Sequence, residues 1–463
     1  MTDVSVEAGS FRDPRGRIYY VDSRVLRTVM PMAVADFDYV RSSGLIEALH
    51  SDGKLVGESL VDNTELGACA NGAAYVLEHP RIPFISYPYE WPFSALKSAA
   101  LLHLDIQQSA LQKGVTLTDA SAYNVQFVGS RPIFIDSLAF RRYNDGEFWV
   151  GHRQFCEQFV NPLLLRAYTG VAHNAWFRGR LEGISAEDLS RVLPWRSRLS
   201  WNVLTHVMMQ ARLQGSASSN DAVRRAKDRK LPKIGFEQML HGLRKWITKL
   251  EPKADTRTVW QDYAGDNSYA DAEAEQKRAF VAEFSSTVKP ALLFDVGCNT
   301  GDYSLAALEN GAAMAIGFDF DQGALELGFQ RAASSRANFL PLLLDAANPS
   351  PDLGWRQAER LGLQRRTQGD AVIGLALIHH LAIAKNLPLQ GVIDWLIDMA
   401  PQGVLEFVPK QDPMVQRLLQ LREDLFVDYN EQTFVDCLQA RARIVKSIVA
   451  SASGRILYWF DRA

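Results

Sequence analysis

A glycine turn flanked by two aspartates carries the most specific chemical signal in this chain. Asp295 lies in a short apolar run that leads into the turn G-C-N-T-G, and Asp319 ends the next apolar run. A dinucleotide-binding fingerprint, G-x-G-x-x-G, needs its middle glycine so that the backbone can approach a pyrophosphate. Asn299 occupies that middle position here. The turn therefore suits a ligand that has no pyrophosphate.

The two carboxylates indicate which ligand would fit instead. A carboxylate at Asp295 suits a cationic or amino group, and one at Asp319, at the end of a strand, can hold two ribose hydroxyls. A ribose without a pyrophosphate, joined to a positively charged amino-acid tail, describes S-adenosylmethionine. The alternative is an ordinary strand–helix–strand crossover with a glycine turn. The candidate cofactor residues of this segment are Asp295, Gly297, Asn299, Thr300, Gly301 and Asp319.

Further ionisable residues stand at the ends of later predicted strands. Asp345 follows a third apolar run, where its carboxylate would accept from the adenine amino group. His379 and His380 end a fourth strand, at the sheet edge where open α/β folds bind ligands, and a histidine titrates near neutrality. Glu406 lies in a fifth strand and Lys410 just beyond it. We take these last four as candidate catalytic groups.

Two alternatives apply to this catalytic set. One histidine of the pair could cap the strand and pack inward, so that only the other lines a site. Glu406 and Lys410 could form a surface ion pair of little energetic value. A neighbouring segment, W-Q-D-Y-A-G-D-N-S-Y at 260–269, precedes an acidic helix. Its Tyr263 and Tyr269 are candidate cofactor contacts, or else aromatic side chains that pack on the sheet.

The elements that must position these residues form an α/β unit. Apolar strands alternate with helical patterns, which predicts a Rossmann-like, doubly wound parallel sheet over 256–463. A terminal antiparallel pair would complete seven strands. The predicted strands cover 292–296, 312–318, 339–344, 370–378, 404–408, 444–449 and 455–460.

The first part of the chain, 1–180, predicts an α+β domain, and helical residues 181–255 would link it to the sheet. Asp119, Asn124 and Asp136 stand in a loop and after a hairpin, as the catalytic and metal-binding groups of protein kinases do. This part therefore resembles a kinase-like fold. It departs from the kinase pattern in having no glycine-rich loop and in offering Arg27 where a phosphate-pairing lysine would sit. These departures argue against phosphotransfer, and a polar turn that caps the hairpin is the alternative.

Composition bounds the remaining possibilities. The chain has 463 residues, a net charge of −3, 47% hydrophobic and 22% charged residues. This predicts a globular protein with no dedicated nucleic-acid or membrane surface, and it assigns no oligomeric state. We expect neither a signal peptide nor a membrane span. The four cysteines are far apart and form no zinc pattern, so no metal is predicted, and a cytoplasmic location is expected.

Seven segments spread over the whole chain carry a resemblance to a known family: FRDP at 11–14, SYPYEW at 86–91, LTDASAYNVQF at 117–127, RQFCEQF at 153–159, DVGCNTG at 295–301, LALIHHLAI at 375–383 and EFVPKQDPMVQRLL at 406–419. Through them the chain resembles one bacterial family, the nodulation protein NoeA-like family of class I methyltransferases. The resemblance implies methyl transfer from S-adenosylmethionine.

The methyl acceptor is left open by this resemblance. The loop after the fourth strand reads I-H-H-L and not N-P-P-Y, the type found in enzymes that methylate base or glutamine amino groups. An oxygen or nitrogen of a small-molecule or glycan acceptor is therefore expected. The alternatives are a bifunctional protein with kinase-like and methyltransferase-like parts, or a regulatory binding protein.

Overall fold

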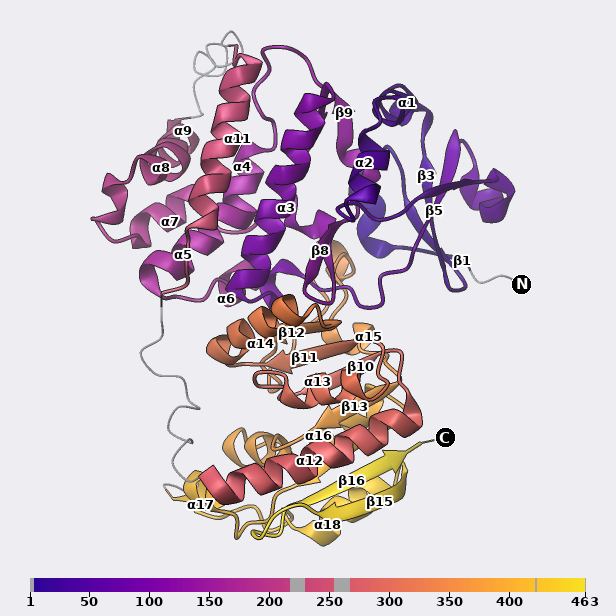
Figure 1. Ribbon diagram of the computed structural model, residues 1–463, viewed down its shortest axis with the longest axis vertical. Helices are drawn as coiled ribbons and strands as arrows, with labels where there is room; N and C mark the ends of the chain where they lie inside the picture. Colours follow the sequence, from indigo (N-terminus) through magenta and orange to yellow (C-terminus); the bar gives the residue numbers. More distant parts are fainter. Residues whose placement is uncertain (1–3, 217–229, 254–266, 421–422, 463) are drawn as a thin grey trace. The chain divides into compact units, whose positions relative to one another are not determined.

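The computed structural model describes residues 4–216, 230–253, 267–420 and 423–462 (Figure 1). The chain divides into two compact units. The first comprises Met1–Phe127, Pro132–Ala254 and Asp352–Arg360, and the second Val128–Arg131, Asp255–Pro351 and Leu361–Ala463. The domain boundary expected at 256 falls within 254–266, outside the described residues.

The first unit combines a five-stranded antiparallel sheet with a set of helices. The sheet has the strand order β1-β2-β3-β5-β4, and two smaller pairs, β6 with β9 and β7 with β8, lie outside it. The strands are β1 (Val4–Val6), β2 (Ile18–Val21), β3 (Arg24–Val29), β4 (Ser59–Val61), β5 (Tyr75–His79), β6 (Val115–Leu117), β7 (Val125–Val128), β8 (Arg131–Phe134) and β9 (Phe140–Arg142). A mixed α/β composition is thus confirmed for this part of the chain.

Helix α3 is the buried helix of the first unit, with Leu96, Leu104 and Leu111 fully buried along it. Helix α11 packs on α3, so residues from the 181–255 region belong to this unit. The helices are α1 (Val34–Ser42), α2 (Leu45–Ser51), α3 (Phe93–Gln112), α4 (His152–Phe155), α5 (Asn161–Thr169), α6 (Asn174–Gly179), α7 (Ala186–Val192), α8 (Trp201–Val203), α9 (Met209–Ser216) and α11 (Lys233–Thr248).

The second unit is built on one seven-stranded sheet with the order β12-β11-β10-β13-β14-β16-β15. Strands β12 to β14 are parallel, and β16 runs antiparallel to both β14 and β15. The strands are β10 (Leu293–Val296), β11 (Ala315–Asp319), β12 (Phe339–Leu343), β13 (Ala371–Gly374), β14 (Gln402–Phe407), β15 (Arg443–Val449) and β16 (Ile456–Asp461). The predicted Rossmann-like sheet with a terminal antiparallel pair is confirmed.

Helices cover this sheet, which explains why its central strands are buried throughout. Every residue of β10 and of β13 is buried, as expected for parallel strands with both faces covered. Phe284 of α12 and Phe339 of β12 lie in the same buried cluster as Leu293. The helices are α12 (Asn267–Val288), α13 (Asp302–Glu309), α14 (Gln322–Ser335), α15 (Leu363–Arg366), α16 (Leu389–Asp398), α17 (Pro413–Leu419) and α18 (Glu431–Gln439).

Candidate functional site

The glycine turn after β10 is held in a conformation that its residue types permit. Gly297 and Gly301 have φ values of 84° and 86°, and Asn299 has a φ of 50°. Glycine adopts this left-handed region without steric cost, and asparagine is enriched there among the other residues. A side chain at Gly301 would also overlap the ring of Phe339 on β12. The turn is therefore closely packed against the neighbouring strand.

Asp295 lies directly before this turn and is almost fully buried, at 1% exposure. The hydroxyl of Ser304 on α13 donates to its Oδ2 at 2.6 Å. Burial raises the pKa of Asp295 to about 7, although the Ser304 hydrogen bond opposes that rise. This carboxyl group therefore changes charge near neutral pH, and a nearby cation would favour its ionised form.

Asp319 ties the end of β11 to the turn. Its Oδ2 accepts from the Asn299 backbone N–H at 2.8 Å, and its Oδ1 accepts from the Asp321 N–H at 2.9 Å. Burial raises the pKa of Asp319, while these backbone N–H groups lower it. A carboxylate has about four lone-pair sites, so Asp319 can still accept from further hydroxyl groups.

The remaining cofactor candidates lie in three different places: in the glycine turn, beyond β12, and in or before α12. The side chain of Thr300 faces Asp302 and Arg331, whose Nη1 lies 3.1 Å from Thr300 Oγ1. Asp345 is exposed just beyond β12, the strand beside β11, and accepts locally from the Ala347 N–H. Tyr263 lies outside the described residues. Tyr269 falls in the first turn of α12, and its side chain is outside the described part of the structure.

An aromatic residue at this edge escaped sequence reasoning. Phe320 directly follows Asp319 and is 59% exposed. Exposing a large aromatic ring leaves its apolar surface in water, so a ligand that covers the ring would recover that free energy. The signal was visible in the sequence as an aromatic residue immediately after the strand-end carboxylate.

The two histidines follow β13 and differ in environment. Their ring centroids are 4.2 Å apart. His379 is 1% exposed, and its ring nitrogens have no hydrogen-bond partner among the described residues, whereas His380 is half-buried. Burial lowers the pKa of both rings, most strongly that of His379. Both histidines are therefore neutral near pH 7.

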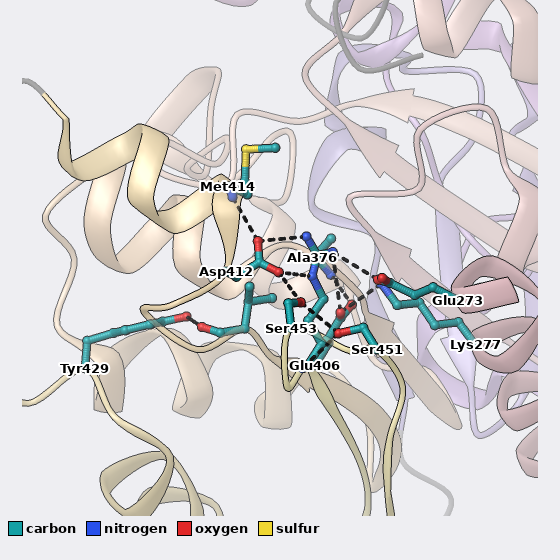
Figure 2. A network of polar contacts seen from close by, with 11 residues as sticks. Glu273, Lys277, Ala376, Glu406, Asp412, Met414, Tyr429, Ser451 and Ser453 are labelled. Carbon is teal, nitrogen blue, oxygen red and sulfur yellow. Dashed lines mark hydrogen bonds and ion pairs between the residues drawn. The ribbon is translucent and has the colours of Figure 1, made fainter. Parts of the chain in front are cut away.

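Glu406 is the centre of a buried ionic network (Figure 2). Its side chain is fully buried, and its Oε2 accepts from the Ala376 N–H at 2.7 Å. The Nζ of Lys277 on α12 lies 2.9 Å from Glu406 Oε1 and 2.7 Å from Glu273 Oε1. Glu406 thus fixes the loop after β13 to β14 and α12, and the histidines follow that loop.

Lys410 does not pair with Glu406. Its Nζ lies 2.7 Å from Asp424 Oδ2, in a partly exposed pair. Arg455 instead extends the buried network, with its Nε 2.7 Å from Asp412 Oδ2, and Ser453 donates to the same oxygen at 2.6 Å. The structure therefore separates the two residues that the sequence suggested as a pair.

A cavity of about 500 Å³ lies beside this network within the second unit. Glu273, Asp412 and Arg455 contribute charged groups to its wall, and Met414 contributes an apolar one. Burial is the main cause that lowers the pKa of His380, and the positive charge of the nearby Arg455 is the second cause. The cavity is lined by residues of α12, of the segment that begins α17 and of the turn between β15 and β16, and none of the four candidate catalytic residues is among them.

In the first unit, the three kinase-like positions come together. Asn124 Nδ2 donates to Asp119 Oδ1 at 3.2 Å, and Arg27 Nη2 lies 2.7 Å from Asp136 Oδ1. Burial, and after it the nearby Asp136 carboxylate, raise the pKa of Asp119 to about 7. The arginine on β3 therefore neutralises one of the two clustered carboxylates.

Fold and site together define a Rossmann-like unit with a carboxylate-flanked glycine turn at the carboxyl edge of its sheet. No protein-family model matches the chain. No helix in the described residues is long and apolar enough to cross a membrane.

Among solved structures, the magnesium protoporphyrin IX methyltransferase ChlM from Synechocystis PCC 6803 with bound SAM is 19% identical to this chain. The match has a TM-score of 0.31 and covers 44% of this chain and 89% of that one. The N-methyltransferase NodS from Bradyrhizobium japonicum WM9 in complex with S-adenosyl-L-homocysteine is 13% identical, with a TM-score of 0.32, over 44% and 95%.

A full-length relative shows the family. Nodulation protein NoeA of Rhizobium meliloti (strain 1021) is 45% identical to this chain over 458 residues, which are 98% of this chain and 96% of that protein. The chain therefore belongs to the NoeA family of nodulation proteins.

Proposed function

We propose that the protein is an S-adenosylmethionine-dependent methyltransferase. The observation that carries this proposal is the bond between Asp319 and the Asn299 N–H, which joins the strand-end carboxylate to a turn that lacks the middle glycine of a pyrophosphate site. This arrangement favours a ribose without a pyrophosphate. The buried Asp295 beside it favours a cationic group.

The residues at this edge suggest how the cofactor would be held. Asp319 would accept from the ribose hydroxyls, and Asp345 from the adenine amino group. Phe320, exposed beside Asp319, offers its ring to the adenine face. Asp295 would balance the charge of the amino-acid tail through the turn. Tyr263 and Tyr269 are kept as proposed contacts on the preceding segment.

The residues after β13 and β14 would serve the acceptor. When bound, S-adenosylmethionine supplies an electrophilic methyl group for in-line displacement, so alignment of the acceptor supplies most of the rate. His380 is neutral and half-buried, and its ring can take a proton from an acceptor hydroxyl or amine. His379 and Glu406 would hold the loop, and Lys410 would lie at its edge. The charged cavity wall suits a polar acceptor, such as a small molecule or glycan.

Calorimetry with S-adenosylhomocysteine tests the proposal. The wild-type chain should bind the compound, and Asp319→Ala should weaken binding by about 1–3 kcal/mol because the hydroxyl partners are left unmatched. Asp394 is a surface carboxylate on α16, so Asp394→Asn is the matched control and should bind S-adenosylhomocysteine as wild type does. Equal affinity in Asp319→Ala and wild type would remove Asp319 from the ribose role, and absence of binding to wild type would refute the function.

We also propose that the first unit follows a kinase-like arrangement without kinase activity. The support is the juxtaposition of Asp119 with Asn124 and the pairing of Arg27 with Asp136. A carboxylate already neutralised by arginine is a weaker metal ligand. Incubation of the chain with Mg-ATP should therefore give no ATP hydrolysis. ATP hydrolysis that disappears in Asp136→Ala would contradict this and favour a bifunctional protein.

A further inference from the structure

Three potential metal ligands from separate parts of the first unit meet in one place. His152 lies on α4, and Cys156 begins a π-helical turn, Cys156–Val160, four residues later on the same helical face. His206 lies in a second π-helical turn, Leu204–Met208. One ligand atom from each side chain lies within 4.8 Å of the other two. π-helical turns occur frequently at functional sites.

The distances are close to those of a tetrahedral site. His152 Nε2 is 3.0 Å from His206 Nδ1 and 3.8 Å from Cys156 Sγ. Tetrahedral zinc with ordinary bond lengths sets about 3.3 Å between two nitrogens and about 3.6 Å between nitrogen and sulfur. The third pair, Cys156 Sγ and a ring nitrogen of His206, lies within 4.8 Å, so the three side chains surround one position that an ion could occupy.

Gln210 supplies the neighbour that a metal-binding histidine usually has. Its Nε2 lies 2.9 Å from His152 Nδ1 and 3.5 Å from Cys156 Sγ. Its Oε1 is buried and has no hydrogen-bond partner among the described residues. Oxygen and nitrogen of an amide are assigned from the hydrogen-bond network, and exchanging them would let Oε1 accept from a His152 Nδ1–H. That bond would leave Nε2 of His152 free to bind a metal.

The surroundings favour a soft transition metal over a hard cation. Cys156 is fully buried, and the ring of His206 stacks on Trp246 at 6.0 Å between centroids. Imidazole binds a metal ion through a ring nitrogen that carries no proton. Sulfur and imidazole ligands are those that zinc prefers.

We propose that His152 Nε2, Cys156 Sγ and His206 Nδ1 form a binding site for a zinc-type divalent ion, with a fourth position open to water. On binding, the Cys156 S–H bond breaks, its proton passes to solvent, and the thiolate sulfur binds the metal. The alternative is a hydrogen-bonded pair of histidines packed in an aromatic core beside an inert thiol.

Cobalt(II) is the probe that distinguishes a metal site from a hydrogen-bonded pair of histidines beside an inert thiol. The full-length chain, stripped of metal by dialysis, should bind one equivalent of Co²⁺ and develop a thiolate-to-cobalt charge-transfer absorption, which added Zn²⁺ should erase. Cys156→Ser should abolish that absorption, and His206→Ala should weaken Co²⁺ binding at least tenfold. Cys69→Ser changes an exposed cysteine of the same unit and should leave the spectrum unchanged.

The wild-type spectrum keeps the test valid even where a variant fails to fold. A wild-type chain that shows no thiolate-to-cobalt absorption overturns the proposal. The same holds if the absorption persists in a folded Cys156→Ser variant, as judged by circular dichroism, or disappears in Cys69→Ser. S-adenosylhomocysteine binding lies in the other unit and should be unaffected by Cys156→Ser, so the two proposals fail independently.

Discussion

At the scale of single residues, burial sets the charge of the candidate cofactor site. Asp295 is buried beside Ser304, and Asp319 is buried beneath two backbone N–H groups. The sequence predicted both carboxylates because each ends or leads a recognisable apolar strand. It did not predict that Asp295 titrates near neutrality, since that follows from the depth of burial and not from residue type.

The pKa of Asp295 makes cofactor binding depend on pH. Its carboxyl group, with a pKa of about 7, must lose a proton before it can balance a cationic ligand. Affinity for S-adenosylhomocysteine should therefore rise up to about tenfold from pH 6 to pH 8 and level off above that, because the proton competes only below the pKa. Calorimetry across this range should show a flat profile for Asp295→Asn. An equally steep profile in that variant would contradict this role.

Phe320 should matter for binding and not for folding. The ring is 59% exposed, so Phe320→Ala removes little buried surface and should leave the melting temperature almost unchanged. Loss of stacking on a base typically costs about 1–3 kcal/mol. The control variant is Leu327→Ala on α14. Leu327 is 53% exposed, so this change should alter neither the melting temperature nor the affinity for S-adenosylhomocysteine. Unchanged S-adenosylhomocysteine affinity in Phe320→Ala would exclude the ring from the site.

At the scale of elements, the sequence predicted the strands of the second unit, including β11, which ends at Asp319, and β14, which contains Glu406. It could do so because parallel strands buried on both faces read as apolar runs. It could not predict the partner of Glu406, because Lys277 comes from α12, and a helical pattern does not specify which strand it will face. The His152, Cys156 and His206 cluster could not be predicted for the same reason, since His206 is distant in the sequence and helical patterns do not show which turns pack together.

The ionic network predicts unequal effects for two candidate catalytic residues. Glu406→Ala leaves Lys277 buried with one carboxylate fewer and should cost about 3 kcal/mol of unfolding free energy. Lys410→Ala removes a partly exposed pair with Asp424 and should cost less than about 1 kcal/mol. Urea unfolding of both variants measures the difference. Similar losses would mean that Glu406 is not the structural centre of its network.

The glycine turn allows a second paired comparison. Gly297 and Gly301 both have positive φ, so alanine at either position should cost about 1–2 kcal/mol. At Gly301 the added methyl group also meets the Phe339 ring, and such overpacking costs a further 1–3 kcal/mol or so. A methyl group at Gly297 would lie 3.6 Å from Leu377 Cδ1, which is an ordinary van der Waals contact. Thermal unfolding should therefore rank Gly301→Ala as the less stable variant, and the reverse order would contradict this packing.

At the scale of the whole molecule, the chain passes between the two units more often than the sequence indicates. Residues Asp352–Arg360 lie between β12 and β13 but belong to the first unit. There Arg12 contacts Glu359 through Nε–Oε1 at 2.5 Å and Nη2–Oε2 at 2.8 Å, and the Arg360 guanidinium lies 4.2 Å from the centroid of the Tyr123 ring. Composition and periodicity cannot reveal such an excursion, because its contacts join residues that are distant in the sequence.

Hydrogen–deuterium exchange of the full-length chain with and without S-adenosylhomocysteine tests the central claim most directly, because it reports where the ligand binds. We expect slower exchange in peptides that contain the glycine turn, 297–301, and the end of β11, 319–321, with no change around Asp119 and Asp136. Mg-ATP should leave the turn peptides unchanged. Two results would contradict the assignment of this edge as a methyl-donor site. One is that S-adenosylhomocysteine slows exchange elsewhere but not in the turn peptides, and the other is that saturating ligand slows exchange in no peptide of the chain.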